Sequence, residues 1–129
     1  MKSVSIYALL TLILTASSVA HADAETENFV AYLQDATSPH VAAICEESFP
    51  GFIGDFNQVF PEWQTAYAEQ VVAGMLQAEV AAEKRGQSLS EYSAELINEF
   101  KNKTLQLASK EKERYCTLML MKLMLRPRQ

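Results

Sequence analysis

Hydrophobic residues recur every three or four positions along most of the chain, which is the spacing of one face of an α-helix. No stretch alternates with the period of a β-strand over more than a few residues. The longest helical run extends from Phe52 to Ala82, and we expect a break or kink near Phe60, followed by a new helix with Pro61 in its first turn. Its apolar positions are Phe52, Phe56, Val59, Phe60, Trp63, Tyr67, Val71, Met75, Ala78 and Ala82.

Two shorter helices are predicted before this run. Residues 26–33 carry a short apolar face. A second helix is expected to start with Ser38 as its N-cap and Pro39 in its first turn, because proline is favoured at the first helical position. The pair Pro50 and Gly51 then interrupts the helical pattern.

Turn signals after the long run predict a further helix. Gly86 is placed to end one helix, and Ser88 with Glu91 forms the spacing of a capping box that begins the next. Residues 101–114 have a weaker apolar stripe but contain no glycine or proline. We therefore favour a continuous helix there, with a turn near Ser109 as the alternative.

The last segment is almost entirely apolar between Cys116 and Pro127. A helix that is apolar on all sides is either buried all round or covered by a partner. Together these patterns predict an all-α fold, a small single-domain helical bundle of four to six helices with one disulfide.

The first 22 residues have the anatomy of a secretory signal peptide. Lys2 precedes an apolar run at 6–14, and an Ala-x-Ala pattern follows at 20–22. That run is shorter than the roughly 20 apolar residues that span a bilayer. We expect cleavage after Ala22, with Ala24 as second choice and a buried N-terminal helix as the alternative. The mature chain is then a helical domain at 23–129, periplasmic or secreted, with no membrane span.

Two cysteines, Cys45 and Cys116, lie in this expected mature chain. In an oxidising compartment they are expected to form a disulfide. The bond would close a loop of 71 residues, which the chain-entropy model values at about 4 kcal/mol. The alternative, a thiol nucleophile or metal ligand, would need a base or further ligands, and His40 is the single histidine after residue 22.

Charge and motif content narrow the function classes. Without Lys2 the chain has ten basic and sixteen acidic residues, so its net charge is −6. This charge disfavours nucleic acid and anionic lipid, and it fits either a basic protein partner or simple solubility. Zinc-ligand spacing, a phosphate-binding loop and a haem-attachment motif are missing from the sequence, so no metal and no cofactor is expected. Glu46, Glu47 and His40 are the remaining catalytic candidates, and we expect a non-enzymatic protein.

The segment at 44–56 brings a cysteine, two glutamates and three phenylalanines together. If Cys45 is bonded to Cys116, the aromatic residues after it can pack against the Met/Leu-rich last helix, either as an ordinary core or as a groove for a partner. The candidate partner-binding residues are Phe52, Phe56, Phe60, Trp63, Leu118, Met121 and Leu125. We expect the last three to face outwards, towards another protein or towards a second copy in a homodimer formed through the C-terminal helix.

This plan of export signal, small size, helical content and a single Cys45/Cys116 pair resembles small exported all-helical bacterial proteins. One such group is the periplasmic immunity proteins that neutralise cell-wall-degrading effectors of type VI secretion. The other is the small periplasmic acid-stress chaperones. The resemblance includes no diagnostic motif and assigns no binding residue. It implies an immunity or inhibitor-type protein-binding factor, or alternatively a stress chaperone that holds unfolded clients.

Overall fold

The computed structural model describes the backbone of residues 2–127 and the side chains of residues 23–127. Over this part the chain contains no strand, and its five helices are α1 (Lys2–Ser48), α2 (Phe52–Ala66), α3 (Ala68–Lys84), α4 (Leu89–Gln106) and α5 (Ser109–Leu123). The predicted all-α bundle of four to six helices with one disulfide is thereby confirmed. The predicted signal peptide, residues 1–22, and its cleavage lie outside the residues whose side chains are described.

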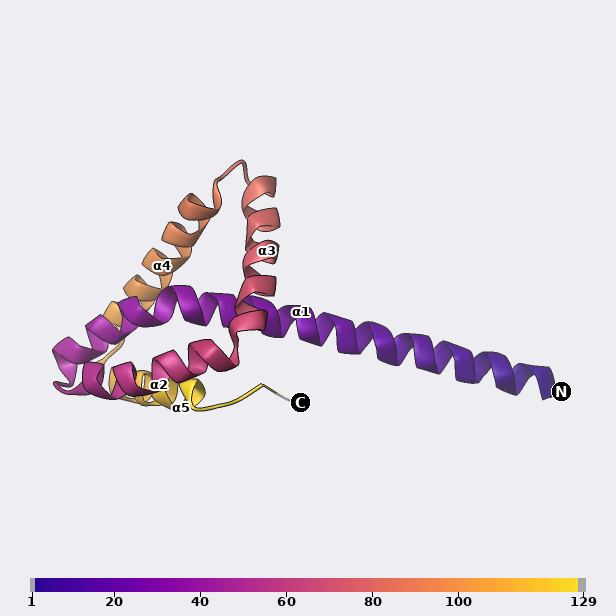
Figure 1. The fold of residues 1–129 in the computed structure, drawn as a ribbon, viewed down its shortest axis with the longest axis horizontal. Coiled ribbons are helices and arrows are strands. Elements are labelled where there is room, and N and C mark those ends of the chain that lie inside the picture. The colour runs from indigo at the N-terminus through magenta and orange to yellow at the C-terminus, as the bar shows by residue number, and fades with distance from the viewer. Residues whose placement is uncertain (1, 128–129) are drawn as a thin grey trace.

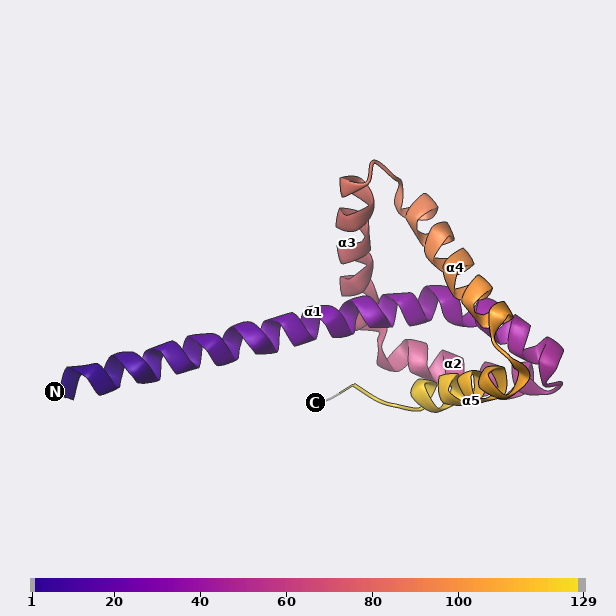
Figure 2. The same cartoon turned by 180° about the vertical axis from the view of Figure 1, so that it is seen from behind.

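Helix α1 is the axis of the fold, because it contacts each of the other four helices. α2 and α5 lie along one side of its C-terminal part, while α3 and α4 form a hairpin that rises from it (Figure 1). The view from behind shows the same arrangement (Figure 2). Within residues 23–127, no helix is long and apolar enough to cross a membrane.

The buried side chains form two clusters, one on each side of α1. The first joins α1, α2 and α5 and contains both cysteines and Trp63. The second joins α1, α3 and α4 around Tyr32 and Tyr92. In the second cluster the hydroxyl groups of Tyr32 and Ser93 are hydrogen-bonded to each other, which ties α1 to α4.

The prediction that a new helix begins at Ser38 is wrong, because α1 continues through Pro39 to Ser48. Proline removes one backbone donor from a helix interior. In the turn before Pro39, the Thr37 hydroxyl donates a hydrogen bond to the Leu33 carbonyl at 2.6 Å. Thr37, Ser38 and Val41 are all buried against neighbouring helices. Tertiary packing on both sides of Pro39 therefore keeps the helix continuous.

The predicted break near Phe60 is also wrong, since α2 runs through Pro61 and ends at Ala66. Four aromatic rings stack in sequence along this helix, with centroids 4.7, 5.8 and 5.2 Å apart from Phe56 through Phe60 and Trp63 to Tyr67. These stacked rings lie on both sides of Pro61 and support the continuous helix. The chain instead turns at Tyr67, where φ is −106° and ψ is 15°.

Small residues bring α3 against α1. Gly74, Ala78 and Ala82 recur every fourth position and are buried. A Cβ at residue 74 would lie 2.7 Å from the carbonyl carbon of Asn28 and 2.8 Å from the Cβ of Tyr32. The close crossing of the two helices therefore requires glycine at this position.

The turn between α3 and α4 matches the sequence signals. Gly86 has φ 67°, and the Gln87 N–H donates to the Ala82 carbonyl at 2.9 Å, as in a Schellman C-cap. The Ser88 hydroxyl accepts from the Glu91 N–H at 3.1 Å. These bonds confirm Gly86 as the helix end and Ser88 as the N-cap of α4.

The favoured continuous helix over 101–114 is wrong, and the alternative turn near Ser109 is confirmed. α4 ends at Gln106, Leu107 and Ala108 are extended, and α5 begins at Ser109. No glycine or proline marks this break. The break redirects the chain so that α5 lies beside α1 and α2. Cys116 of α5 then reaches Cys45 of α1.

Candidate functional site

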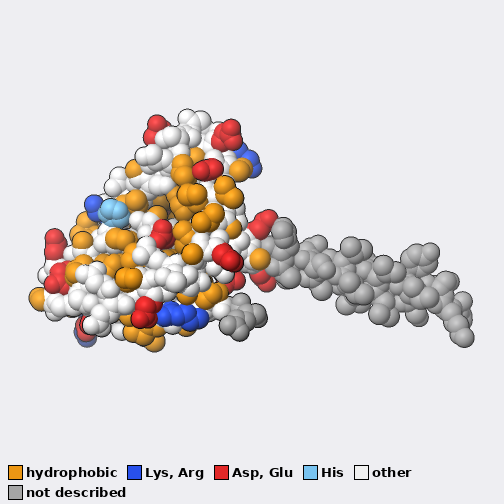
Figure 3. Space-filling view, in the orientation of Figure 1, with side chains coloured by type: hydrophobic (Ala, Val, Ile, Leu, Met, Phe, Trp, Pro, Cys, Tyr) orange, Lys and Arg blue, Asp and Glu red, His pale blue; other side chains and the backbone are white. Residues whose placement is uncertain are grey.

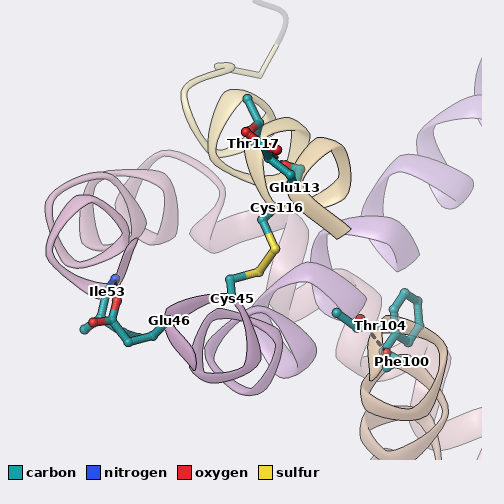
Figure 4. The surroundings of a disulfide bond; sticks show 8 residues. All are labelled: Cys45, Glu46, Ile53, Phe100, Thr104, Glu113, Cys116 and Thr117. Carbon is teal, nitrogen blue, oxygen red and sulfur yellow. Dashed lines mark hydrogen bonds between the residues drawn. A yellow bond between two sulfur atoms is a disulfide. The ribbon is translucent and has the colours of Figure 1, made fainter. Parts of the chain in front are cut away.

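The disulfide between Cys45 and Cys116 fixes the geometry of the site. Its two Cα atoms are 6.0 Å apart, and both residues are buried. The bond ties the last turns of α1 to the middle of α5 (Figure 4). The predicted cysteine pairing is confirmed, and the alternatives of a free nucleophile or metal ligand do not apply to these two residues.

Glu46, next to this disulfide, caps the start of α2. Its carboxylate oxygens accept hydrogen bonds from the backbone N–H of Ile53 at 2.8 Å and of Gly51 at 3.1 Å, and Figure 4 shows the side chain reaching towards Ile53. These bonds, led by the one from Ile53, lower the pKa of the Glu46 carboxyl. The N-terminal backbone donors of a helix need such partners. Gly51, in the turn, has φ 98°, a conformation that favours glycine.

The other catalytic candidates are not brought into a common site with Glu46. Glu47 and His40 are exposed on α1. Among the described residues, no group of three or more histidine, cysteine, aspartate or glutamate side chains is placed to hold a metal ion. Helix capping explains the orientation of the Glu46 carboxylate.

Four of the seven candidate partner-binding residues lie in the core. Phe52, Phe56, Phe60 and Trp63 are all buried in the cluster between α1, α2 and α5. These four side chains therefore belong to the core and not to an open contact surface, although Phe52 also lines a hollow at the surface beside Pro50 and Glu113. A role for them in binding a partner stays a prediction. Their burial shows that these aromatic residues belong to a core, which the Cys45–Cys116 disulfide holds in place.

The other three candidates lie on the surface, Leu118 and Met121 on α5 and Leu125 just after it. Leu118, Met121 and Leu125 are 42%, 57% and 61% exposed. Leu123, by contrast, is fully buried towards α2 and α1. The last helix is therefore buried on one face and uncovered on the other, as expected for these residues. Their role in binding a partner stays a prediction.

An apolar groove opens beside this surface. A hollow of about 270 Å³ lies between α1, α4 and α5, with Val30, Val41, Phe100 and Leu118 among its walls. A second hollow of about 530 Å³ shares Phe100 and Tyr115 with the first and continues towards the break at Leu107. Concave apolar surfaces of this kind accommodate side chains of a ligand or partner.

This groove was not predictable from the sequence, because its walls come from three helices that are distant in sequence. A second apolar strip, on the outer face of α3, was also not predicted. Val72, Leu76 and Val80 are 55%, 55% and 52% exposed. A signal for this strip was present, since these residues recur every fourth position, next to the apolar stripe that forms the core face.

Comparison with known proteins provides no family assignment. No protein-family model, no curated protein and no solved structure matches this chain at a significant level.

Proposed function

We propose that this chain is an exported, non-enzymatic protein-binding factor of the immunity or inhibitor type, which acts by covering a surface of another protein. The single observation that carries this proposal is the outer face of α5. There, Leu118 and Met121, with Leu125 just after the helix, are exposed beside an apolar groove, and the other face of the helix is fastened by a buried disulfide.

A rigid apolar surface is suited to specific binding because it is already ordered before the partner arrives. The disulfide joins α5 to α1, and Leu123 packs α5 into the same cluster. Leu118 also lines the groove, so a side chain from a partner can enter between α1 and α5 while the rest of its surface covers Met121. The net negative charge of the chain favours long-range encounter with a basic protein, whereas Arg114 and Lys122 place positive charge beside the α5 surface itself.

The test is recovery of a partner from the cell envelope with an affinity-tagged protein. We expect the wild type to retain a defined protein and the double variant Leu118→Gln/Met121→Gln to lose it. Leu105→Gln is the matched control, because Leu105 is an exposed leucine on α4 outside both hollows. Failure of the wild type to retain any protein, or equal retention by the α5 variant, would contradict the proposal.

A second candidate function is a holdase for unfolded proteins. It is favoured by Met121 and Met124, both 57% exposed, because flexible methionine side chains adapt to many clients. A client-aggregation assay between acid and neutral pH separates the two functions. A holdase suppresses aggregation of several unrelated clients, whereas a specific factor protects none of them.

A further inference from the structure

Helix α3 has bulky apolar residues on its outer face as well as on its inner side, where Val71 and Met75 pack against the core. Its buried face carries the small residues Gly74, Ala78 and Ala82, while its outer face carries the bulky Val72, Leu76 and Val80. A surface helix normally turns its large apolar residues inwards. Hydrophobic side chains gather over α3 in the space-filling view (Figure 3). The outer strip is therefore an apolar surface that the helices of its own chain leave uncovered.

Acidic residues border this strip. Glu69 precedes Val72 by three positions, Glu79 follows Leu76 by three, and Glu83 follows Val80 by three. Residues with this spacing are neighbours on a helix surface, and all three glutamates are exposed. Lys84 is the one cation in this helix. The outer face of α3 is thus apolar in its centre and negative at its border.

The outer face of α5 has the opposite charge pattern. Exposed Arg114 and Lys122 stand four positions before and after Leu118. In the first turns of the helix the charges of Lys110 and Lys112 are offset by those of Glu111 and Glu113. Leu118 and Met121 of α5 are therefore bordered by the positive charges of Arg114 and Lys122, although the chain as a whole is acidic.

We propose that the outer face of α3 of one molecule binds the outer face of α5 of a second copy. Pairing two α3 faces would oppose glutamates with glutamates, and pairing two α5 faces would oppose cations with cations. The α3–α5 pairing buries both apolar strips and places unlike charges together, which favours association and its register. Each molecule then keeps one unused face, so the contact is heterologous and extends into a chain or closes into a ring.

This inference rests on the same α5 surface as the proposed function, and a foreign partner on α5 competes with the second copy. Its test needs only purified protein. Sedimentation equilibrium over the micromolar to millimolar range should show a mass that rises with concentration. Higher salt should weaken the association, because exposed charges are screened beyond about 8 Å at physiological ionic strength.

Two double variants test the pairing itself. Val72→Gln/Leu76→Gln removes the α3 strip, and Leu118→Gln/Met121→Gln removes the α5 strip. Each alone should weaken self-association by about tenfold or more, because the apolar transfer free energy of the contact is lost. Mixed in equal amounts they should form a one-to-one dimer, since the mixture contains one intact face of each kind. Leu105→Gln should assemble as the wild type does.

The border charges provide a second variant whose apolar strip is intact. Glu79→Lys/Glu83→Lys should also weaken self-association, and circular dichroism should show unchanged helix content in every variant. The inference is overturned if the wild type stays monomeric at millimolar concentration or if the mixed variants stay monomeric. Normal assembly of either double variant alone would equally overturn it, because that result indicates pairing of like faces.

The experiments distinguish failure of the proposed function from failure of the proposed self-association. Loss of self-association in the α3 variant, with retention of a foreign partner, leaves the proposed function intact. Self-association that follows the predicted pattern, with no foreign partner recovered, supports assembly with a second copy alone.

Discussion

Gly74 of α3 packs directly against the backbone of Asn28 in α1, so the two helices cross without an intervening side chain. Replacement Gly74→Ala would place a methyl group into the Asn28 carbonyl. Alanine improves helix propensity by about 1 kcal/mol, but overpacking costs about 1–3 kcal/mol. We expect a net loss of up to about 2 kcal/mol in the free energy of unfolding, measured by urea denaturation.

The matched control is Gly54→Ala in α2, where an added Cβ has no atom within 4 Å. This change should stabilise the protein by about 0.5–1 kcal/mol, because only the helix propensity changes. Equal effects of the two substitutions would show that α1 and α3 do not meet closely at residue 74.

Pro39 interrupts the hydrogen-bond ladder of α1 while its own side chain is exposed. Pro39→Ala should therefore raise the free energy of unfolding by about 1–3 kcal/mol, because an interior proline costs a helix about 3 kcal/mol and the more flexible unfolded chain returns part of that gain. Thermal and urea unfolding both measure it. Pro50→Ala, in the turn after α1, should not give this gain, and a lower stability of Pro39→Ala would contradict a continuous α1.

The Cys45–Cys116 bond should contribute a large share of stability. Replacing both cysteines by serine should lower the free energy of unfolding by about 2–4 kcal/mol. A reducing agent should destabilise the wild type by a similar amount and leave the double variant unchanged. Unfolding curves of the wild type that do not respond to complete reduction would show that the bond does not support the fold.

The capping role of Glu46 predicts a pH dependence. Its pKa is lowered below 4.5 in the folded protein by the N–H groups of Ile53 and Gly51. The charged form is therefore favoured by folding, and its stabilisation is present above the unfolded pKa and lost as the pH falls through the folded pKa. The stability difference between the wild type and Glu46→Gln should be present at neutral pH and shrink in acid.

Glu47→Gln is the control for the Glu46 prediction, since it removes one charge from the neighbouring exposed position. Its stability difference from the wild type should not follow the same pH profile. A Glu46→Gln difference that stays constant down to strongly acid pH would contradict the capping role.

The helical class, the disulfide and the turn at Gly86 were predictable because each depends on a local or chemical signal. Gly86 ends a helix through its φ of 67°, and Ser88 supplies the N-cap expected from its spacing to Glu91. The outward position of Met121 followed from an apolar helix that a small bundle cannot cover on every side.

The continuity of α1 through Pro39 and of α2 through Pro61, and the helix boundary at Tyr67, were not predictable because tertiary packing overrides local preference there. The aromatic rings from Phe56 to Tyr67 stack on both sides of Pro61 and support the continuous α2. The turn at Tyr67 has no sequence signal of its own. It is set by the need for α3 to cross α1 at Gly74, which depends on residues far apart in the chain.

The bond between Cys45 and Cys116 makes a covalent ring of the segment that contains α2, α3 and α4. The exposed tip of that ring, around Gly86, lies at the far end of the α3–α4 hairpin (Figure 1). A single proteolytic cut at the tip would open the ring without releasing either part. The nicked molecule would migrate as one species on a non-reducing gel and separate into two fragments only after reduction.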